Sequence, residues 1–469
     1  MPRSPQPTRR HFLAASASAA ITAKAAPSDK VTVGIIGSGG RAVFETKQYP
    51  SFDNTVIVAI ADAQESRRTG AKQALEKQYA DQGRPNSGIR LYSDFRELLA
   101  QKDIDAVYIA TPDHWHVSMT MAALKAGKHV HCEKPLGVSV EQDLAALKAV
   151  RASNKVYQYG AERRSTAEAR KGIELIVNGR IGKVQKIYVI APPSLTGGSP
   201  TPVTEPPKGF DYDMWLGPAP KKPFCADRCL EGSGRNGIFV IYDYSLGNLA
   251  NWAAHPMDQV QWWADNSGRK ESPIRYEGAG AVPTEGLFDA VLWWDVKCTY
   301  QDGLELRMVD SDTYKKYTDA PHPQMPFGRP GVTAVHNGAV FMGSEGWAIV
   351  SYEKVVFSDP KVMDSVIGPN EIHLQDTALA TIPKGMPTGH QPVATAGHHQ
   401  NWIRAIRGEG KTVGNIESAV RSDLVSQFCD LCIRTGKPIL WDPKKETIVG
   451  NDAARKLMKR PMRAPWGVA

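Results

Sequence analysis

The feature that most constrains the fold is a glycine-rich turn directly after a short apolar run at residues 31–36. Gly37, Gly39 and Ala42 have the G-x-G-x-x-G/A spacing. In this motif the first glycine permits a tight turn, the second lets the backbone approach a pyrophosphate, and the small third residue lets a helix pack on a strand. Twenty residues past Ala42, a second apolar run ends in Asp62, where an acid can bind ribose hydroxyls. Strand, turn and acid together predict a dinucleotide-binding βαβ unit.

The acid at position 62 also bears on which dinucleotide binds. A carboxylate there repels a 2′-phosphate, which favours NAD, whereas Arg67 and Arg68 keep NADP as the second candidate. Backbone amides at the start of the following helix face the phosphates. We therefore predict NAD, held by Gly37, Ser38, Gly39, Gly40, Arg41 and Asp62.

Alternating strand and helix patterns continue to residue 162 and predict a doubly wound parallel sheet. Strand patterns occur at residues 106–110, in a segment that begins at His129, and at residues 156–160. Helix patterns lie between them, at residues 117–126 and 139–152. Loops after the carboxyl ends of such strands line the cofactor crevice. From these loops we expect further cofactor contacts by Thr111, Pro112, His116, Glu133, Lys134, Gln158 and Arg164.

From about residue 183 the pattern changes to long strands with few helices between them, at 184–190, 286–298, 304–309 and 338–352. This pattern predicts an α+β domain with a large open, mostly antiparallel sheet. The stretch 193–236, rich in Pro, Gly and Lys, is expected to be an insertion that covers the site. We expect a dinucleotide-binding domain at residues 31–162, a substrate and oligomerisation domain at 163–450 and a C-terminal tail at 451–469.

Composition and charge exclude several classes of protein. With 42% hydrophobic and 23% charged residues, the chain is globular rather than disordered or fibrous. The formal charge is +8, but half of this excess lies in the first 26 residues, which hold four basic side chains and no acid. The basic cluster near the C-terminus is not interleaved with aromatic residues, so we expect no nucleic-acid partner.

The first 26 residues have the pattern of an export signal. Arg9 and Arg10 precede Phe12 and a weakly apolar stretch, which ends in the small-x-small pattern of residues 23–25. We therefore predict a twin-arginine signal over residues 1–26 and a periplasmic location. No later apolar run approaches the length of a membrane span, so no membrane anchor is expected.

The motifs along the chain resemble those of a known family. After the glycine-rich turn come Ala110-Thr111-Pro112, His116 and Glu133-Lys134-Pro135. Further motifs are Gly182-Lys183-Val184, Trp215-Leu216-Gly217-Pro218, 251–258, Trp441-Asp442-Pro443 and Pro465-Trp466. In this order they resemble the oxidoreductase family that contains glucose-fructose oxidoreductase, inositol dehydrogenase and the MocA rhizopine protein, over residues 31–466.

The resemblance implies a small-molecule sugar or glycoside substrate and a homo-oligomer, dimer or tetramer, formed through the second domain. It implies no metal, and the pairs His114/His116 and His398/His399 lack the carboxylate or cysteine partners of a metal site. The second half of the chain is rich in aromatic residues, whose faces can stack on the C–H face of a sugar.

Lys134 is the first candidate catalytic residue. It follows a strand and precedes a proline that fixes the backbone, which directs its amine into the cofactor crevice. The resemblance implies that this lysine contacts the cofactor ribose and the reacting hydroxyl. An ammonium there stabilises a developing alkoxide, and burial lowers its pKa toward the range useful for acid–base catalysis.

Asn251, His255 and Asp258 are the other candidate catalytic residues and fall on one face of an expected helix. The resemblance implies that His255 is the base or acid, with an acidic residue four positions before it. Asn251 stands in place of that acid, so we expect His255 to be a weaker base unless Asp258 takes over the role. Pro256 would kink such a helix.

Three functions fit these observations. An exported enzyme meets no free NAD pool, so the leading hypothesis is an oxidoreductase that acts on a sugar, cyclitol or glycoside hydroxyl with tightly bound, recycled NAD. The second is an NAD-dependent, redox-neutral glycosidase or lyase that works through a ketosugar. The third is a non-catalytic sugar- or nucleotide-binding protein on the same fold, an alternative that Asn251 leaves open.

Overall fold

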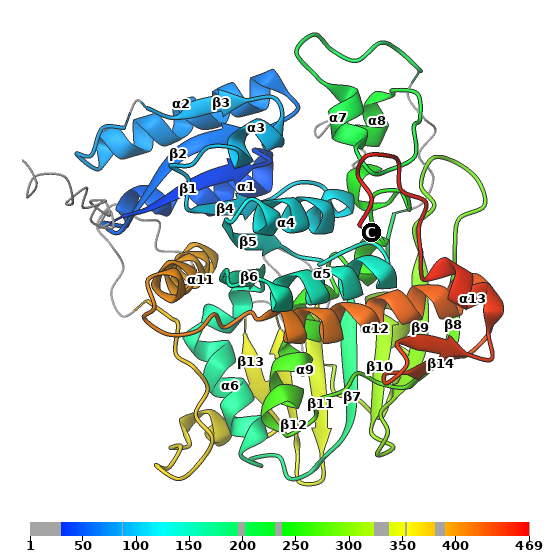
Figure 1. Ribbon diagram of the computed structural model, residues 1–469. Coiled ribbons are helices and arrows are strands. Elements are labelled where there is room, and N and C mark those ends of the chain that lie inside the picture. Colours follow the sequence, from blue (N-terminus) through cyan, green and yellow to red (C-terminus); the bar gives the residue numbers. More distant parts are fainter. Residues whose placement is uncertain are drawn as a thin grey trace, which may run out of the picture.

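The structure, a computed structural model, describes residues 30–86, 88–195, 202–229, 237–322, 337–351, 354–379 and 390–468. It contains two sheets with helices packed on and between them (Figure 1). The predicted export signal lies outside the described residues, as do positions 196–201 and 230–236 of the expected insertion.

The first sheet has six parallel strands in the order β3-β2-β1-β4-β5-β6. Its strands are β1 (Val31–Ile36), β2 (Thr55–Ala61), β3 (Arg90–Tyr92), β4 (Ala106–Ile109), β5 (His129–Glu133) and β6 (Tyr157–Gly160). The helices that alternate with them are α1 (Gly40–Thr46), α2 (Glu65–Asp81), α3 (Phe95–Leu99), α4 (His116–Lys125) and α5 (Val140–Ala152). Apart from β3 at the edge of the sheet, whose three residues are half-buried, the strands are mostly buried, as expected where helices cover both faces of a parallel sheet. The predicted doubly wound sheet is confirmed.

The second sheet has nine strands in the order β13-β12-β11-β7-β10-β9-β8-β14-β15, and only its β7–β10 pair is parallel. Its strands are β7 (Val184–Ala191), β8 (Arg275–Ala281), β9 (Trp293–Thr299), β10 (Glu305–Asp310), β11 (Gly338–Gly343), β12 (Trp347–Ser351), β13 (Val355–Phe357), β14 (Ile439–Asp442) and β15 (Thr447–Val449). The remaining helices are α6 (Ala167–Val177), α7 (Tyr212–Leu216), α8 (Ala226–Cys229), α9 (Ala254–Asn266), α10 (Ser311–Tyr314), α11 (His390–Ile406), α12 (Ile416–Thr435) and α13 (Asp452–Leu457). The predicted mostly antiparallel sheet is confirmed.

Two of the expected strands in this sheet were drawn too long. The strand expected at 286–298 begins only at Trp293, and the one expected at 338–352 is a hairpin of β11 and β12. The hairpin turns at residues 344–346, where the N–H of Gly343 donates to the carbonyl oxygen of Gly346 (2.8 Å). The polar turn Gly343-Ser344-Glu345-Gly346 interrupts the second pattern, but the apolar runs on both sides of it were interpreted as one strand.

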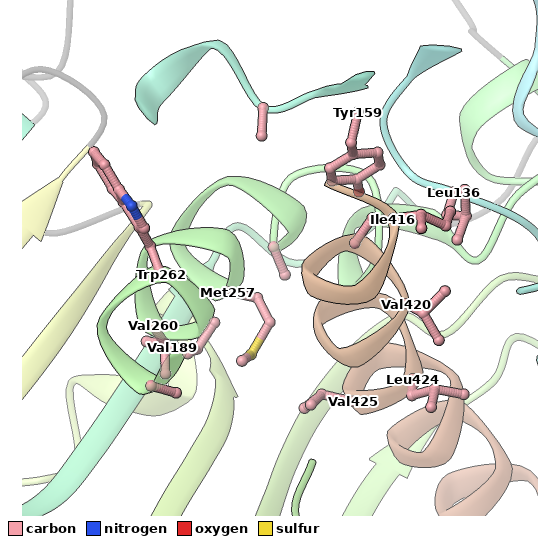
Figure 2. Close-up of a cluster of buried hydrophobic side chains, with 14 of the residues drawn as sticks. Leu136, Tyr159, Val189, Met257, Val260, Trp262, Ile416, Val420, Leu424 and Val425 are labelled. Carbon is pink, nitrogen blue, oxygen red and sulfur yellow. The ribbon is translucent and has the colours of Figure 1, made fainter. Parts of the chain in front are cut away.

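Helix α12 joins the two halves of the molecule. It contacts α5 on one side and α9 and β8 on the other, and its residues 418–420 and 422–432 are buried all round. Figure 2 shows Val420 and Leu424 of α12 in the cluster that also holds Met257 of α9 and Leu136. Because Leu136 closely follows Lys134, this shared core fixes the lysine turn relative to α9.

The C-terminal segment returns to the first domain. The ring of Trp466 packs edge-on against Trp115 at 4.9 Å between centroids, and the guanidinium of Arg96 lies 4.9 Å from the Trp466 ring centroid. The backbone N–H of Arg463 donates to the carbonyl oxygen of Pro218 (2.9 Å). Among the helices of the described ranges, none is long and apolar enough to cross a membrane.

Candidate active site

A cavity of about 550 Å³ opens where the parallel strands β1, β2, β4 and β5 end, and residues of the second domain form its far wall. Twelve predicted site residues line it: Gly37, Gly39, Gly40, Arg41, Asp62, Thr111, Pro112, His116, Glu133, Lys134, Asn251 and His255. The structure thus brings the glycine-rich turn, the lysine and the histidine to one cavity.

The glycine-rich turn fits a dinucleotide phosphate. Gly37 has a φ of +84°, and a Cβ at this position would lie 2.7 Å from the carbonyl oxygen of Ala110. A side chain is therefore excluded by both conformation and space. The N–H of Gly37 donates to the carbonyl oxygen of Ala61 (2.8 Å), which holds the turn against β2. Gly39 and Gly40 then present bare backbone to the cavity.

Asp62 is fixed at the edge of the same cavity. Its Oδ2 accepts the backbone N–H (2.7 Å) and the hydroxyl (3.0 Å) of Ser38, and its Oδ1 accepts the N–H of Gln64 (2.8 Å). Ser38 does not line the cavity and acts through Asp62. A carboxylate held in this way suits the ribose hydroxyls of NAD. Arg67 also lines the cavity.

Lys134 is held by both oxygens of Asn251. Its Nζ donates to the Asn251 carbonyl oxygen (2.9 Å) and to Oδ1 (3.2 Å). Burial lowers the pKa of Lys134, and the neighbouring Glu133 carboxylate opposes that shift. Asn251 therefore positions the ammonium by neutral acceptors, without adding a second charge.

His116 braces the turn next to Lys134. Its Nδ1 lies 2.6 Å from the carbonyl oxygen of Pro135, and its Nε2 lies 3.0 Å from that of Thr111. The imidazole thus bridges the turn after β4 and the turn after β5. Asp113 lies beside it in the cavity wall, and burial raises the pKa of this carboxyl.

The prediction that one helix contains both Asn251 and His255 is wrong. Helix α9 begins at Ala254, so Asn251 lies in the turn before it and His255 in its first turn. Pro256 also falls in the first turn, where a backbone N–H would have no helical partner. The proline therefore produces no kink of the kind expected.

The acidic partner of His255 is Glu162, which sequence reasoning missed. Nδ1 of His255 lies 4.0 Å from Oε1 of Glu162, a residue two positions beyond β6. Burial lowers the pKa of His255 to about 3, and the Glu162 carboxylate opposes this shift. Its position after the carboxyl end of a parallel strand was the signal that could have identified it.

Three carboxylates surround Arg41 of the glycine-rich turn. Its Nη2 lies 2.7 Å from Glu45 and 3.3 Å from Glu162, and its Nε lies 3.5 Å from Glu133. Burial alone would raise the pKa of Glu162, but Arg41 and His255 hold it well below its usual range. Burial raises the pKa of Glu45 to about 7 against the opposing charge of Arg41. Of the three carboxyls, the one nearest His255 is thus the one whose pKa is lowered, whereas burial raises the pKa of Glu45 and of Glu133.

Besides Ser38, three predicted site residues do not reach the cavity. Arg164 and Asp258 form a buried ion pair, with Nη2 2.7 Å from Oδ1, so Asp258 is not the partner of His255. Gln158 is fully buried in β6, and its Nε2 donates to the carbonyl oxygen of His398 (2.7 Å). The Arg164–Asp258 pair thus lies within the second domain, and Gln158 links β6 to α11, so none of the three lines the cofactor crevice.

His398 and His399, the second histidine pair, come from a helix of the second domain. They lie in the middle of α11, and both are buried. Nε2 of His399 is 3.2 Å from Oε2 of Glu45, which links α11 to the carboxylates around Arg41. In the described ranges, no three His, Cys, Asp or Glu residues come together in a way that could hold a metal ion.

Comparison with known proteins agrees with this geometry. Residues 31–161 match the model of the Gfo/Idh/MocA oxidoreductase family, NAD-binding Rossmann fold, and residues 139–328 match that family's C-terminal α/β domain. Myo-inositol 2-dehydrogenase of Thermotoga maritima is 28% identical over 167 residues, which are 35% of this chain and 47% of that protein. A glycosyl hydrolase family 109 protein of Shewanella sp. (strain W3-18-1) is 34% identical over 114 residues, 24% of each chain.

The chain spans less than half the length of these curated relatives. Among solved structures, levoglucosan dehydrogenase in complex with NADH and levoglucosan superposes with a TM-score of 0.58 at 18% identity, over 88% of this chain and 99% of that one. At this identity the likeness concerns the fold. The two family models together extend over residues 31–328, more than half of the chain, and the chain therefore belongs to the Gfo/Idh/MocA oxidoreductase family, with an NAD-binding Rossmann domain.

Proposed function

We propose that the protein oxidises a secondary hydroxyl of a sugar, cyclitol or glycoside and transfers the hydride to NAD. The observation that carries this proposal is the meeting of Lys134 and His255 in the cavity formed by the glycine-rich turn and Asp62. A cation and a base beside a nicotinamide site are what alcohol oxidation requires.

The chemistry divides among these side chains. NAD, when bound, accepts the hydride from the carbinol carbon. Lys134, held by Asn251, stabilises the alkoxide that develops on the substrate. His255 is neutral because burial lowers its pKa, so it accepts the hydroxyl proton, and Glu162 stabilises the imidazolium that results.

We further propose that the NAD is retained and recycled between two substrates. Support comes from a segment of the second domain that pairs with the residues after Asp62. The N–H of Asp211 donates to the carbonyl oxygen of Ala63 (2.9 Å), and that of Glu65 donates to Gly209 (2.8 Å). Helix α7, which follows, contributes to the cavity wall. This pairing of the second domain with the residues after Asp62, next to the expected ribose site, is expected to slow the release of the nucleotide.

The function is tested on purified full-length protein without added cofactor. We expect bound NAD in extracts of the denatured protein, and reduction of that NAD when a sugar substrate is added. A second, oxidised sugar should then return it to NAD. Protein that contains no nucleotide and acquires none at micromolar NAD would overturn the proposal.

A redox-neutral glycosidase or lyase is the alternative, favoured by the local similarity to a glycosyl hydrolase family 109 protein. Transient oxidation to a ketosugar acidifies the neighbouring C–H and permits elimination of the glycosidic substituent. Release of the aglycone from an aryl glycoside without net NADH would establish this activity. A non-catalytic binding protein would yield neither NADH nor aglycone.

We also propose export through the twin-arginine pathway. The joint change Arg9→Lys and Arg10→Lys is expected to leave an uncleaved precursor in the cytoplasm, because this pathway reads the arginine pair. Cell fractionation and intact mass of the recovered protein measure the outcome, with Arg3→Lys as the matched control. Periplasmic, processed protein from the double variant would contradict the proposal.

A further inference from the structure

Apolar side chains gather at the catalytic end of the cavity. Trp252 lies between Asn251 and His255 in sequence, lines the cavity and remains 36% exposed. Its ring centroid is 6.3 Å from that of His255. The Trp252 carbonyl oxygen accepts a hydrogen bond from Nδ2 of Asn337 (2.9 Å), which anchors the backbone beneath the indole.

An apolar wall continues from Trp252. Asn248, one turn before Trp252, donates from Nδ2 to the carbonyl oxygen of Pro193 (2.9 Å) and from its backbone N–H to Oγ of Ser194 (2.9 Å). These bonds bring Leu195 to the same wall, where its side chain is 57% exposed. Phe239, which is half-buried, also lines the cavity, and the buried side chains of Ile238 and Val240 support it from the core. Exposed apolar groups that converge on a cavity mark a ligand surface.

The basic groups of the lining are already engaged. Arg41 faces three carboxylates and His116 faces two carbonyl oxygens. Lys134 is held by Asn251 and, in the proposed function, serves the reacting hydroxyl rather than a charge elsewhere on the substrate. Arg67 comes from the start of α2, close after Asp62 at the ribose end. Among the described lining residues, the wall around Trp252 thus has no cation that could pair with a negatively charged substrate. Burying the charge of such a substrate there without a partner would be costly.

We propose that this site takes uncharged glycosides with an apolar aglycone, the pyranose ring stacking on Trp252 and the aglycone packing on the wall formed by Leu195 and Phe239. The inference rests on the proposed function and narrows its substrate class. A free sugar or cyclitol carries hydroxyl groups around its whole edge. Those polar groups would face the apolar wall without a hydrogen-bond partner on it. An apolar aglycone removes the wall from water.

Two measurements on the NAD-loaded full chain test this. NADH formation is compared for phenyl β-D-glucopyranoside, methyl β-D-glucopyranoside, glucose, myo-inositol and phenyl β-D-glucuronide, and the binding of each is measured by calorimetry. We expect kcat/KM for the phenyl glucoside to exceed that for glucose by about 10-fold or more, from the added apolar contact. The glucuronide should bind more weakly than the glucoside.

Variants assign the effect to Trp252. Trp252→Ala is expected to raise KM for the phenyl glucoside about 10-fold with less than about a threefold change in kcat, since stacking is present in both ground and transition states. Phe239→Ala should raise KM for the phenyl glucoside more than KM for glucose. Trp293→Ala, which removes a similarly exposed tryptophan that does not line the cavity, is the matched control.

Equal kcat/KM for glucose and the phenyl glucoside, or equal use of the glucuronide, would overturn the inference. If the phenyl glucoside binds through Trp252 but no NADH forms and no phenol is released, the apolar subsite stands and the proposed oxidation fails. If glucose or myo-inositol reduces the bound NAD as efficiently as the phenyl glucoside does, the oxidation stands and the subsite fails.

Discussion

Replacement of Lys134 by methionine is expected to slow single-turnover reduction of the bound NAD by about 10³-fold, or about 4 kcal/mol of transition-state stabilisation. Methionine keeps most of the length of the side chain but removes the ammonium, which donates to Asn251 and, in the proposed function, faces the reacting hydroxyl. Because the developing alkoxide is the group that this cation stabilises, the loss should appear in the rate of the chemical step rather than in nucleotide binding.

Stopped-flow measurement of NADH formation at saturating sugar gives the rate, and the nucleotide content of the variant gives binding. Lys77→Met, which removes a lysine with 74% side-chain exposure that pairs with Asp81 across one turn of α2, is the matched control. A correctly folded Lys134→Met variant that retains its NAD and reacts within about tenfold of the wild-type rate would remove Lys134 from the mechanism.

The fold followed closely from the sequence because its signals are local. The Gly37 turn, the apolar strands and their spacing are determined within a few residues, and each predicts a parallel βαβ arrangement. The hairpin of β11 and β12 was not predicted because both strands are apolar and the turn between them has no proline or Asn-Gly pair.

The site was predicted less completely because its partners are distant in sequence. Lys134 and His255 carry motifs, but their partners are chosen by packing between domains. Asp258 lies three residues from His255 yet pairs with Arg164, while Glu162, 93 positions away in sequence, faces the imidazole. Sequence spacing can place side chains on one helix face but cannot reveal which buried cation claims a carboxylate.

Glu162→Gln is expected to slow NADH formation by roughly 10²-fold with NAD still bound, because the amide no longer stabilises the imidazolium of His255. Arg41 keeps Glu45 and Glu133 as partners, so we expect little loss of thermal stability. Because proton transfer becomes slower, the solvent deuterium isotope effect on the single-turnover rate should increase, a change that a merely structural role would not produce.

The pH profile gives a second readout. An unperturbed histidine titrates near about pH 6.5 and, as the base, would make the oxidation rate fall below that pH. Because burial lowers the pKa of His255 to about 3, the base stays neutral well below the usual range of histidine. The wild-type oxidation rate should therefore show no histidine-type decline between about pH 5 and pH 7. A decline centred near pH 6.5 that disappears in His255→Asn would contradict this assignment.

The variant Asp258→Asn tests which of two carboxylates, Asp258 or Glu162, supports His255 as the base. It leaves Arg164 buried without its charged partner, which costs about 3–5 kcal/mol of stability. We expect a lowered melting temperature with the isotope effect and pH profile of the wild type, the opposite signature from Glu162→Gln. If instead Asp258→Asn altered the isotope effect and Glu162→Gln did not, the base would depend on the carboxylate inside α9, and the contact between Glu162 and His255 would be structural only.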